Sequence, residues 1–293
     1  LFQDQGAKAL EQLWGTSALV IAAQDGRFTV ARDDLGIAPL YWARRGETVL
    51  FASELKAFDA EWRPDVEPFP PGHAWTPEGG LIGGPSFPAA TPVLLNSLAP
   101  YEEPPGWVFD ALRDTIIRSV RRSLDAVVPV GVLLSGGVDS SIVVAVAAHL
   151  AAERGQTLPT FAVGMQGSPD LAAARLVAEQ AGTDHHELIY TAQDAIALVP
   201  TIIAELESFD PTLVHSAVPH HLVSQLASEH VRVVLAGEGA DELFAGYAHY
   251  GRHTSGADLH EELLETLEGM HIGGLQRLDR MAGAHGIEPR LPF

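Results

Sequence analysis

The stretch Val-Leu-Leu-Ser-Gly-Gly-Val-Asp-Ser-Ser, residues 132–141, decides the fold of this chain. The β-branched run 127–134 predicts a buried strand, and the amphipathic run that begins at Ser141 predicts a helix. A strand that turns through glycines into a helix N-terminus forms an anion site, because unpaired N–H groups point at the ligand. Asp139 would repel a phosphate there unless a cation bridges the two, and Mg²⁺ is the cation we expect.

The spacing Ser-Gly-Gly-x-Asp-Ser is far more specific than a bare Ser-Gly-Gly, which is typical of any hairpin turn. The Walker loop, Gly-x-x-x-x-Gly-Lys, is absent. The stretch resembles the pyrophosphate loop of ATP pyrophosphatases, enzymes that cleave ATP to AMP and pyrophosphate while they adenylate a substrate. An ordinary strand-to-helix turn is the alternative, and the strand before the loop and the helix after it favour the functional interpretation.

Composition and charge narrow the class of protein. The chain has 293 residues, of which 46% are hydrophobic and 19% charged, as in a globular protein of one large or two ordinary domains. A net charge of −20 disfavours nucleic acid and anionic membranes as partners. No apolar run approaches the roughly 20 residues that span a bilayer, and no signal peptide is visible. Cysteine is absent, so we expect a cytoplasmic protein without disulfides.

The predicted secondary structure differs between the first third of the chain and the rest. Residues 1–95 predict a β-rich, antiparallel domain that is incomplete, with hairpins at 18–32 and 39–53, followed by turns and linker over 64–92. Residues 96–293 alternate helix and strand, which predicts an α/β fold with a parallel sheet and helices on both faces. The expected helices are 108–124, 141–154, 168–182, a region interrupted at Pro200, and 216–230; the expected strands are 127–134, 159–164, 186–191 and 231–236.

A second signal follows the last of these strands, in Ala-Gly-Glu-Gly-Ala-Asp-Glu-Leu-Phe-Ala-Gly-Tyr at 236–247. Glu238, Asp241 and Glu242 place three carboxylates within five residues, and proteins tolerate such repulsion where a cation compensates it. For Glu242, an acidic helix N-terminus explains the residue equally well. Ligands of parallel sheets bind beyond the carboxyl ends of strands, so we expect 135–140 and 237–242 to form one site.

With these motifs the chain resembles the glutamine-dependent asparagine synthetases of the bacterial type. The resemblance extends over almost the whole chain, at residues 31–41, 51–57, 69–73, 133–141, 161–164, 167–171, 182–186, 237–247 and 286–293. It implies that residues 1–95 are the last part of a glutaminase domain of the N-terminal nucleophile type. It also implies that residues 96–293 are the ATP-binding synthetase domain, which we expect to be incomplete at its C-terminal end.

The resemblance implies an ATP- and Mg²⁺-dependent ligase. Such enzymes adenylate the side-chain carboxylate of aspartate, release pyrophosphate, and let ammonia displace AMP to give asparagine. Glu238 would be the catalytic residue beside the activated acyl group, and Asp139 and Asp241 would hold Mg²⁺. Thr212 and His215 would contact the substrate. The residues implied for ATP binding are Leu133, Ser135, Gly136, Gly137, Asp139, Ser140, Val163, Gly164, Ala236 and Gly237.

The chain departs from the family pattern in three places. The family's glutaminase uses an N-terminal cysteine, and this chain has none. A family lysine that meets the activated phosphate lies beyond the last matching motif, whereas the lysines here are Lys8 and Lys56. At His215 asparagine synthetases often carry arginine, whose bidentate fork histidine cannot reproduce. We therefore expect ATP binding without efficient turnover, and no glutaminase activity.

Two other functions remain open from the sequence. One is a related amide former of the β-lactam synthetase type, and the other is a non-catalytic nucleotide-binding homologue. A zinc site is disfavoured, because His249 and His253 lack a third ligand at suitable spacing. The expected partners are ATP, aspartate and ammonia. The sequence leaves the oligomeric state open, with a homodimer as one alternative.

Overall fold

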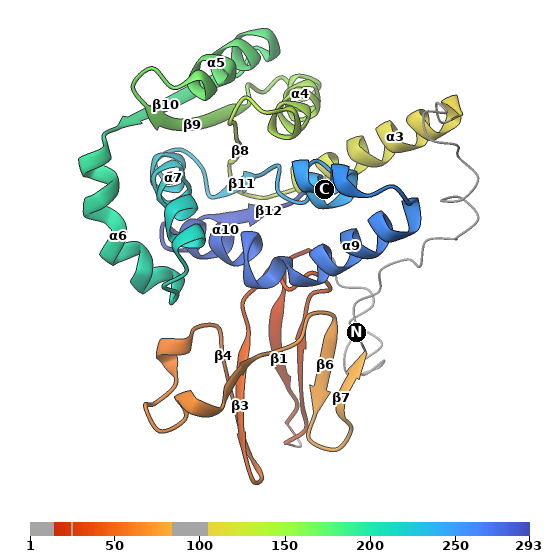
Figure 1. Ribbon diagram of the computed structural model, residues 1–293, viewed down its shortest axis with the longest axis vertical. Helices are drawn as coiled ribbons and strands as arrows, with labels where there is room; N and C mark the ends of the chain where they lie inside the picture. Colours follow the sequence, from red (N-terminus) through yellow and green to blue (C-terminus); the bar gives the residue numbers. More distant parts are fainter. Residues whose placement is uncertain (1–14, 25, 84–104) are drawn as a thin grey trace. The chain divides into compact units, whose positions relative to one another are not determined.

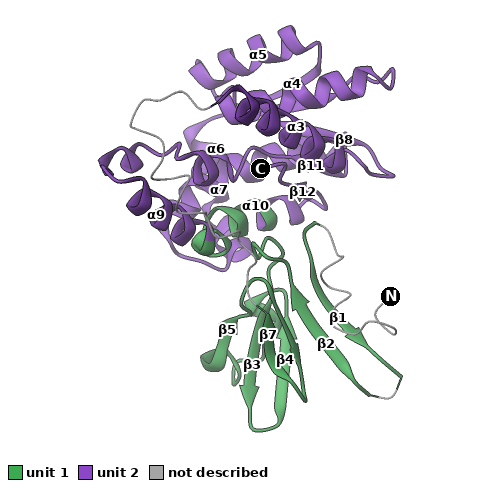
Figure 2. Cartoon of the chain, turned by 90° about the vertical axis from the view of Figure 1, so that its right-hand side faces the viewer, with its two compact units in different colours: residues 1–89, 268–279 green, residues 90–267, 280–293 purple. Residues whose placement is uncertain are grey.

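The computed structural model describes residues 15–24, 26–83 and 105–293. The chain divides into two compact units, one made of 1–89 with 268–279 and the other of 90–267 with 280–293 (Figure 2). The sequence boundary expected between residues 95 and 96 lies outside the described residues and stays a prediction. Within the described part of the chain, no helix has the length and apolar character that crossing a membrane requires.

The second unit is built on a five-stranded parallel sheet with the order β10-β9-β8-β11-β12 (Figure 1). The α/β prediction is therefore confirmed. The strand β12 was missed because three residues with a proline at the centre carry no strand pattern. The strands are β8 (Val130–Leu133), β9 (Pro159–Met165), β10 (Asp184–Tyr190), β11 (Val233–Leu235) and β12 (Glu288–Arg290).

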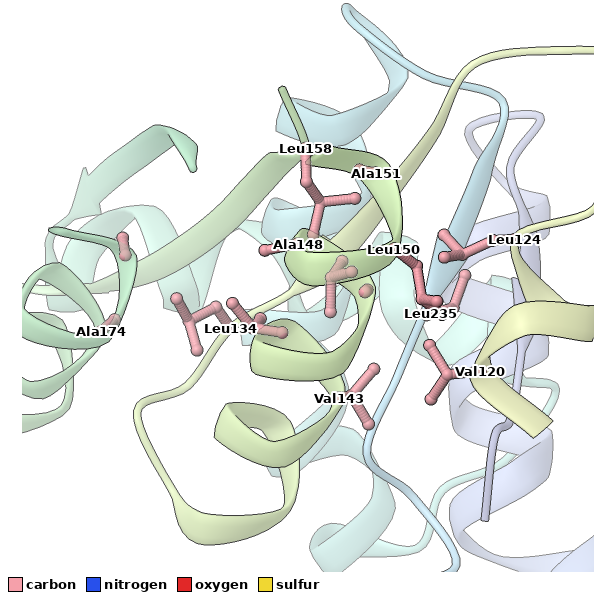
Figure 3. Close-up of a cluster of buried hydrophobic side chains, with 14 of the residues drawn as sticks. Val120, Leu124, Leu134, Val143, Ala148, Leu150, Ala151, Leu158, Ala174 and Leu235 are labelled. Carbon is pink, nitrogen blue, oxygen red and sulfur yellow. The ribbon is translucent and has the colours of Figure 1, made fainter. Parts of the chain in front are cut away.

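Helices cover both faces of this sheet, as predicted. On β8, Val132 faces a core shared with α3, α4 and α5, whereas its neighbour Leu133 packs into a second core with α7. Figure 3 shows the first core, where Val120, Val143 and Leu235 converge from a helix, a second helix and a strand. The α-helices of the described residues are α3 (Gly106–Ser123), α4 (Val138–Ala152), α5 (Pro169–Ala181), α6 (Ala192–Leu206), α7 (Pro211–Ser228), α8 (Ala240–Phe244), α9 (Gly256–Gly269) and α10 (Gly274–Gly283), of which α9 and α10 are divided between the two units.

Several expected boundaries were wrong. The strand expected at 127–134 begins only at Val130, and Val127 is fully exposed. The helix expected at Ser141 begins at Val138, because Gly137 is an extended N-cap and the negative charge of Asp139 suits the first turn. The helix expected from Ser216 begins five residues earlier. There, Asp210 caps it by accepting the N–H groups of Thr212 and Leu213.

Two predictions of irregular structure were also wrong. Helix α6 runs through Pro200 without a break. A capping box at Thr191 stabilises its N-terminus, and the side chains of Ile202 and Leu206 near its C-terminus are completely buried. The stretch 64–92, expected to be turns and linker, contains the short strands β5 (Val66–Pro68), β6 (His73–Thr76) and β7 (Gly80–Gly83). β5 and β6 each pair with a strand far earlier in the chain, and β7 pairs with β6, so pairing overrides their weak local preference.

The first unit contains two antiparallel sheets, with the orders β1-β2-β6-β7 and β4-β3-β5. The two predicted hairpins are confirmed as β1 (Ala18–Ala22) with β2 (Phe28–Arg32) and β3 (Tyr41–Arg45) with β4 (Thr48–Ala52). Both sheets contribute to one core, in which Val30, Trp42 and Phe69 are buried and Phe51 and Trp75 pack against them. The rings of Trp42 and Phe69 meet edge to face, with centroids 5.0 Å apart.

Candidate nucleotide and metal site

The candidate site lies at the carboxyl ends of β8 and β11, which are parallel neighbours in the centre of the sheet. From β8 the chain continues to β9 on one side of β8, whereas β11 and β12 lie on the other side. Strand order reverses at this pair, and open α/β sheets bind ligands at such a point. The two loops touch each other: a Cβ added at Gly237 would lie 3.1 Å from the Ser140 nitrogen and 3.3 Å from the Asp139 Cβ.

The loop after β8 is held together by hydroxyl groups. The Ser135 and Ser140 Oγ atoms lie 3.0 Å apart, and the Ser135 Oγ accepts the Gly137 N–H at 3.3 Å. The Ser140 Oγ in turn donates to the Gly137 carbonyl at 3.2 Å. Because the N-cap Gly137 has no side chain, no side chain caps the first N–H groups of α4. The loop therefore offers N–H donors at the positive end of a helix dipole, an arrangement that suits an anion.

Gly136 fixes the path of this loop. Its φ of +83° lies in the left-handed region, and an added Cβ would come within 2.6 Å of the Ala173 Cβ and 2.7 Å of the Ala174 nitrogen. The loop thus passes directly against α5, where backbone atoms cannot move aside. Only glycine satisfies both the conformation and the space.

The loop after β11 concentrates negative charge. The pKa of Asp241 is raised, first by burial and then by the negative charges of Asp139 and Glu242. Glu242 is buried and accepts a 2.6 Å hydrogen bond from the Tyr247 hydroxyl. Burial and this bond raise the pKa of Tyr247 well above its ordinary value, so the phenol remains a donor. Asp139 and Asp241, which come from different loops, therefore share one electrostatic environment.

This pair of carboxylates fits Mg²⁺. Mg²⁺ prefers oxygen ligands, and it is usually bound by one or two carboxylates together with substrate phosphates and water. A cation between Asp139 and Asp241 would also relieve the repulsion that raises the pKa of Asp241. Among the described residues, no group of three or more His, Cys, Asp or Glu side chains is placed to hold a metal by itself.

The other residues expected to bind ATP lie on adjacent parallel strands. Leu133 ends β8, Val163 and Gly164 lie in β9, and Ala236 follows β11. Leu133 and Val163 both pack against the core that contains Phe161. A Cβ at Gly164 would lie 2.9 Å from the Leu171 Cγ, so α5 approaches this strand closely as well. The contact of Leu133, Val163, Gly164 and Ala236 with a nucleotide stays a prediction.

Thr212 and His215 occupy the exposed beginning of α7. The described contacts of Thr212 stay within this helix and its cap, where its N–H donates to Asp210 Oδ1 at 2.8 Å. The role of Thr212 and His215 toward the substrate therefore stays a prediction. Farther along α7, His220 Nε2 lies 3.4 Å from Glu238 Oε1, a pair that the sequence did not reveal. Eighteen residues separate the two, and only the packing of α7 on the sheet brings them together.

Comparisons with known proteins agree with this geometry. The family model Asparagine synthase matches residues 111–260, and the model Glutamine amidotransferase domain matches residues 1–60. The chain is 37% identical to glutamine-hydrolyzing asparagine synthetase 3 of Arabidopsis thaliana, over 100% of this chain and 51% of that protein. It is 36% identical to glutamine-hydrolyzing asparagine synthetase 2 of Oryza sativa subsp. japonica, over 100% of this chain and 50% of that protein. The chain thus spans about half the length of these curated relatives.

A solved structure, the NH3-dependent NAD synthetase from Campylobacter jejuni, is matched with a TM-score of 0.34 at 12% identity, over 55% of this chain and 77% of that chain. This likeness is too low to carry an argument, and the fold assignment rests on the strand order given above. The family assignment rests on the Asparagine synthase model, which covers half of the chain and includes both loops of the candidate site. This chain belongs to the asparagine synthase family.

Proposed function

We propose that the second unit forms the ATP-dependent, amide-forming site of an asparagine synthetase. In the first step, an aspartate side-chain oxygen bonds to the α-phosphorus of ATP, and pyrophosphate leaves with the electron pair of the broken P–O bond. In the second step, ammonia forms a C–N bond to the acyl carbon and AMP leaves. The observation that supports this proposal is the contact, at Gly237, between an anion-binding loop and a loop rich in carboxylates.

The loop residues have separate roles in this proposal. The N–H groups at the start of α4 and the hydroxyls of Ser135 and Ser140 bind the β- and γ-phosphates and stabilise the departing pyrophosphate. Asp139 and Asp241 would hold Mg²⁺, which supplies positive charge beside the phosphates when bound. Glu238, on the adjacent loop, accepts the proton that ammonia loses on bonding to the acyl carbon. The proposed setting is the cytoplasm, where ATP, Mg²⁺ and aspartate are available together.

The nucleotide part of the proposal is tested by calorimetry with ATP, with and without Mg²⁺. Asp139→Asn should weaken ATP binding about tenfold or more when Mg²⁺ is present and little when it is absent, because the variant loses a carboxylate ligand. Asp184→Asn is the matched control, since Asp184 is exposed at the amino end of β10, away from the carboxyl edge of the sheet. Equal Mg²⁺-dependent affinities for Asp139→Asn and the unchanged chain would contradict the metal-bridge role.

The chemical part is tested by positional isotope exchange, which detects slow or reversible adenylation. ATP labelled with ¹⁸O in the bridge between the α- and β-phosphates should scramble its label only when aspartate is present, because only aspartate accepts the adenylyl group. Asparagine should then form on addition of ammonia. Scrambling without aspartate, or with glutamate as effectively as with aspartate, would contradict the proposed acceptor.

A further inference from the structure

Helix α7 places an imidazole beside the carboxylate expected to act in catalysis. His220 Nε2 lies 3.4 Å from Glu238 Oε1, and the two side chains are 21% and 19% exposed. Both groups are thus mostly withdrawn from water, where a charge interaction is stronger than at an open surface. The distance is longer than an ideal hydrogen bond, as is common for catalytic contacts before a substrate binds.

The surroundings of Glu238 make such a partner useful. Glu238 lies three positions before Asp241, whose pKa is raised by burial and by the negative charges of Asp139 and Glu242. Neighbouring negative charge favours the protonated form of a carboxylate, and a protonated Glu238 could not accept a proton from the amine. An imidazole beside the carboxylate favours its ionised form when the ring is protonated, and it restricts the rotation of the carboxylate.

We propose that His220 is a positioning residue that holds the Glu238 carboxylate ionised and oriented toward the incoming ammonia. This inference rests on the function proposed above, in which Glu238 takes the proton of the nucleophile. When ammonia bonds to the acyl carbon and the C–O bond to AMP breaks, the nitrogen carries an extra proton. Glu238 accepts that proton, and His220 keeps its oxygen in place while it does so.

The next residue on the same helix provides a matched control. His221 Nδ1 lies 3.0 Å from Glu205 Oε2, and its ring lies 4.4 Å from that of His285. His221 therefore also pairs with a glutamate, but this glutamate belongs to α6 rather than to the loop after β11. A substitution at His221, which is buried on the same helix and pairs with Glu205, tests whether a general disturbance of α7 lowers the rate.

The contact is tested first by NMR, which does not depend on turnover. Compared with the unchanged chain, Glu238→Gln should lower the pKa of His220, because it removes the charge that favours the imidazolium, and should leave the ring ¹⁵N shifts of His221 in place. Glu205→Gln should move the ring ¹⁵N shifts of His221 and leave those of His220 in place. The ¹⁵N shifts of the ring nitrogens, followed over a pH titration, report each histidine. An unchanged His220 pKa in Glu238→Gln would overturn the proposal.

The positioning role is tested by the rate of asparagine formation from ATP, aspartate and ammonia. His220→Leu should lower kcat about 10- to 100-fold while the KM for ATP stays within about twofold, because a displaced catalytic group affects the chemical step. His220→Gln, which retains an N–H donor, should recover part of the loss, and His221→Leu should leave kcat unchanged. Full kcat in His220→Leu would overturn the role. If the unchanged chain forms no asparagine, the proposed function fails. The NMR titration still tests the His220–Glu238 contact in that case, because it does not depend on turnover.

Discussion

The two loops that meet at the candidate site satisfy their polar groups in different ways. The loop after β8 is closed by its own hydroxyls, with Ser135 and Ser140 bonded to each other and to the backbone. The loop after β11 instead gathers carboxylates, and the pKa of Asp241 is raised by burial and by its acidic neighbours. The hydroxyls therefore hold the first loop in shape and leave the N–H groups at the start of α4 for an anion, whereas the second loop carries charge that a ligand must balance. This difference indicates that the first loop shapes an anion site and the second supplies the cation's ligands.

The largest effect expected is that of Gly136→Ala, which should destroy the shape of the first loop. A left-handed φ and a 2.7 Å approach to the Ala174 nitrogen leave the new methyl group no room. We expect the unfolding free energy to fall by about 2–4 kcal/mol and ATP affinity to fall about tenfold or more. Urea denaturation and calorimetry measure the two quantities.

Gly155→Ala is the control for this prediction. Gly155 also has a positive φ, +67°, but an added Cβ there would meet nothing within 4 Å. Gly155→Ala should lose only about 1 kcal/mol of unfolding free energy, because it adds backbone strain but no steric clash, and it should bind ATP normally. Equal losses in the two variants would show that backbone conformation, rather than the contact with α5, explains the first result.

The next largest effect is expected at Glu242, the buried carboxylate of the loop after β11. Tyr247→Phe removes the hydroxyl that donates to Glu242 at 2.6 Å, and it should cost about 1–3 kcal/mol of unfolding free energy because the buried carboxylate loses a donor. Tyr250→Phe removes a bond between neutral groups, to Thr266 Oγ1 at 3.1 Å, and should cost less, about 1 kcal/mol. A Tyr250→Phe loss as large as that of Tyr247→Phe would contradict the special role of the charge.

A smaller effect, of opposite sign, is expected for Asp241→Asn. Since the surroundings disfavour the charged form of Asp241, its neutral substitute should slightly raise the melting temperature of the ligand-free chain. The same variant should lose the extra melting temperature that Mg²⁺ with ATP confers on the unchanged chain. Thermal melts with and without Mg²⁺ and ATP measure both changes, and a destabilised ligand-free variant would contradict the interpretation of the second loop.

The smallest effect is a pH dependence that arises outside both loops. Burial lowers the pKa of His185 and of His285 below the ordinary value of 6.5, so below that pH the unfolded chain binds more protons than the folded one. Their contribution to the unfolding free energy is therefore complete above about pH 6.5 and is lost as the pH falls through their lowered pKa values. Asp241 acts in the opposite sense, because the folded state binds its proton more tightly.

Urea midpoints at pH 7.5 and 5.5 should show this small loss of stability in acid. His185→Gln should reduce the loss, since the substitute has no proton to gain. An identical pH dependence in the variant would assign the acid sensitivity to other groups. Repeating the titration with Asp241→Asn separates the histidine contribution of the scaffold from that of the carboxylates of the second loop.

The sequence by itself determined the α/β class, the existence of strands β8 to β11 and the positions of both loops of the candidate site, because their signals are local. A β-branched run followed by Ser-Gly-Gly predicts a strand and an anion loop wherever the chain folds, and the helix expected from residue 168 is capped there by the Ser168 side chain, which accepts the Asp170 N–H. The first-unit hairpins were equally predictable, since each has a turn between two short strands.

Tertiary structure decided what depends on partners far along the chain. The strands β5 to β7 and β12 exist because neighbouring strands satisfy their backbone groups, and α6 continues through Pro200 because its apolar end is buried. The meeting of Asp139 with Asp241, and of His220 with Glu238, follows from strand order and from the packing of α7. Local propensity cannot specify these contacts, because the free energy of each contact depends on two segments that are distant in sequence.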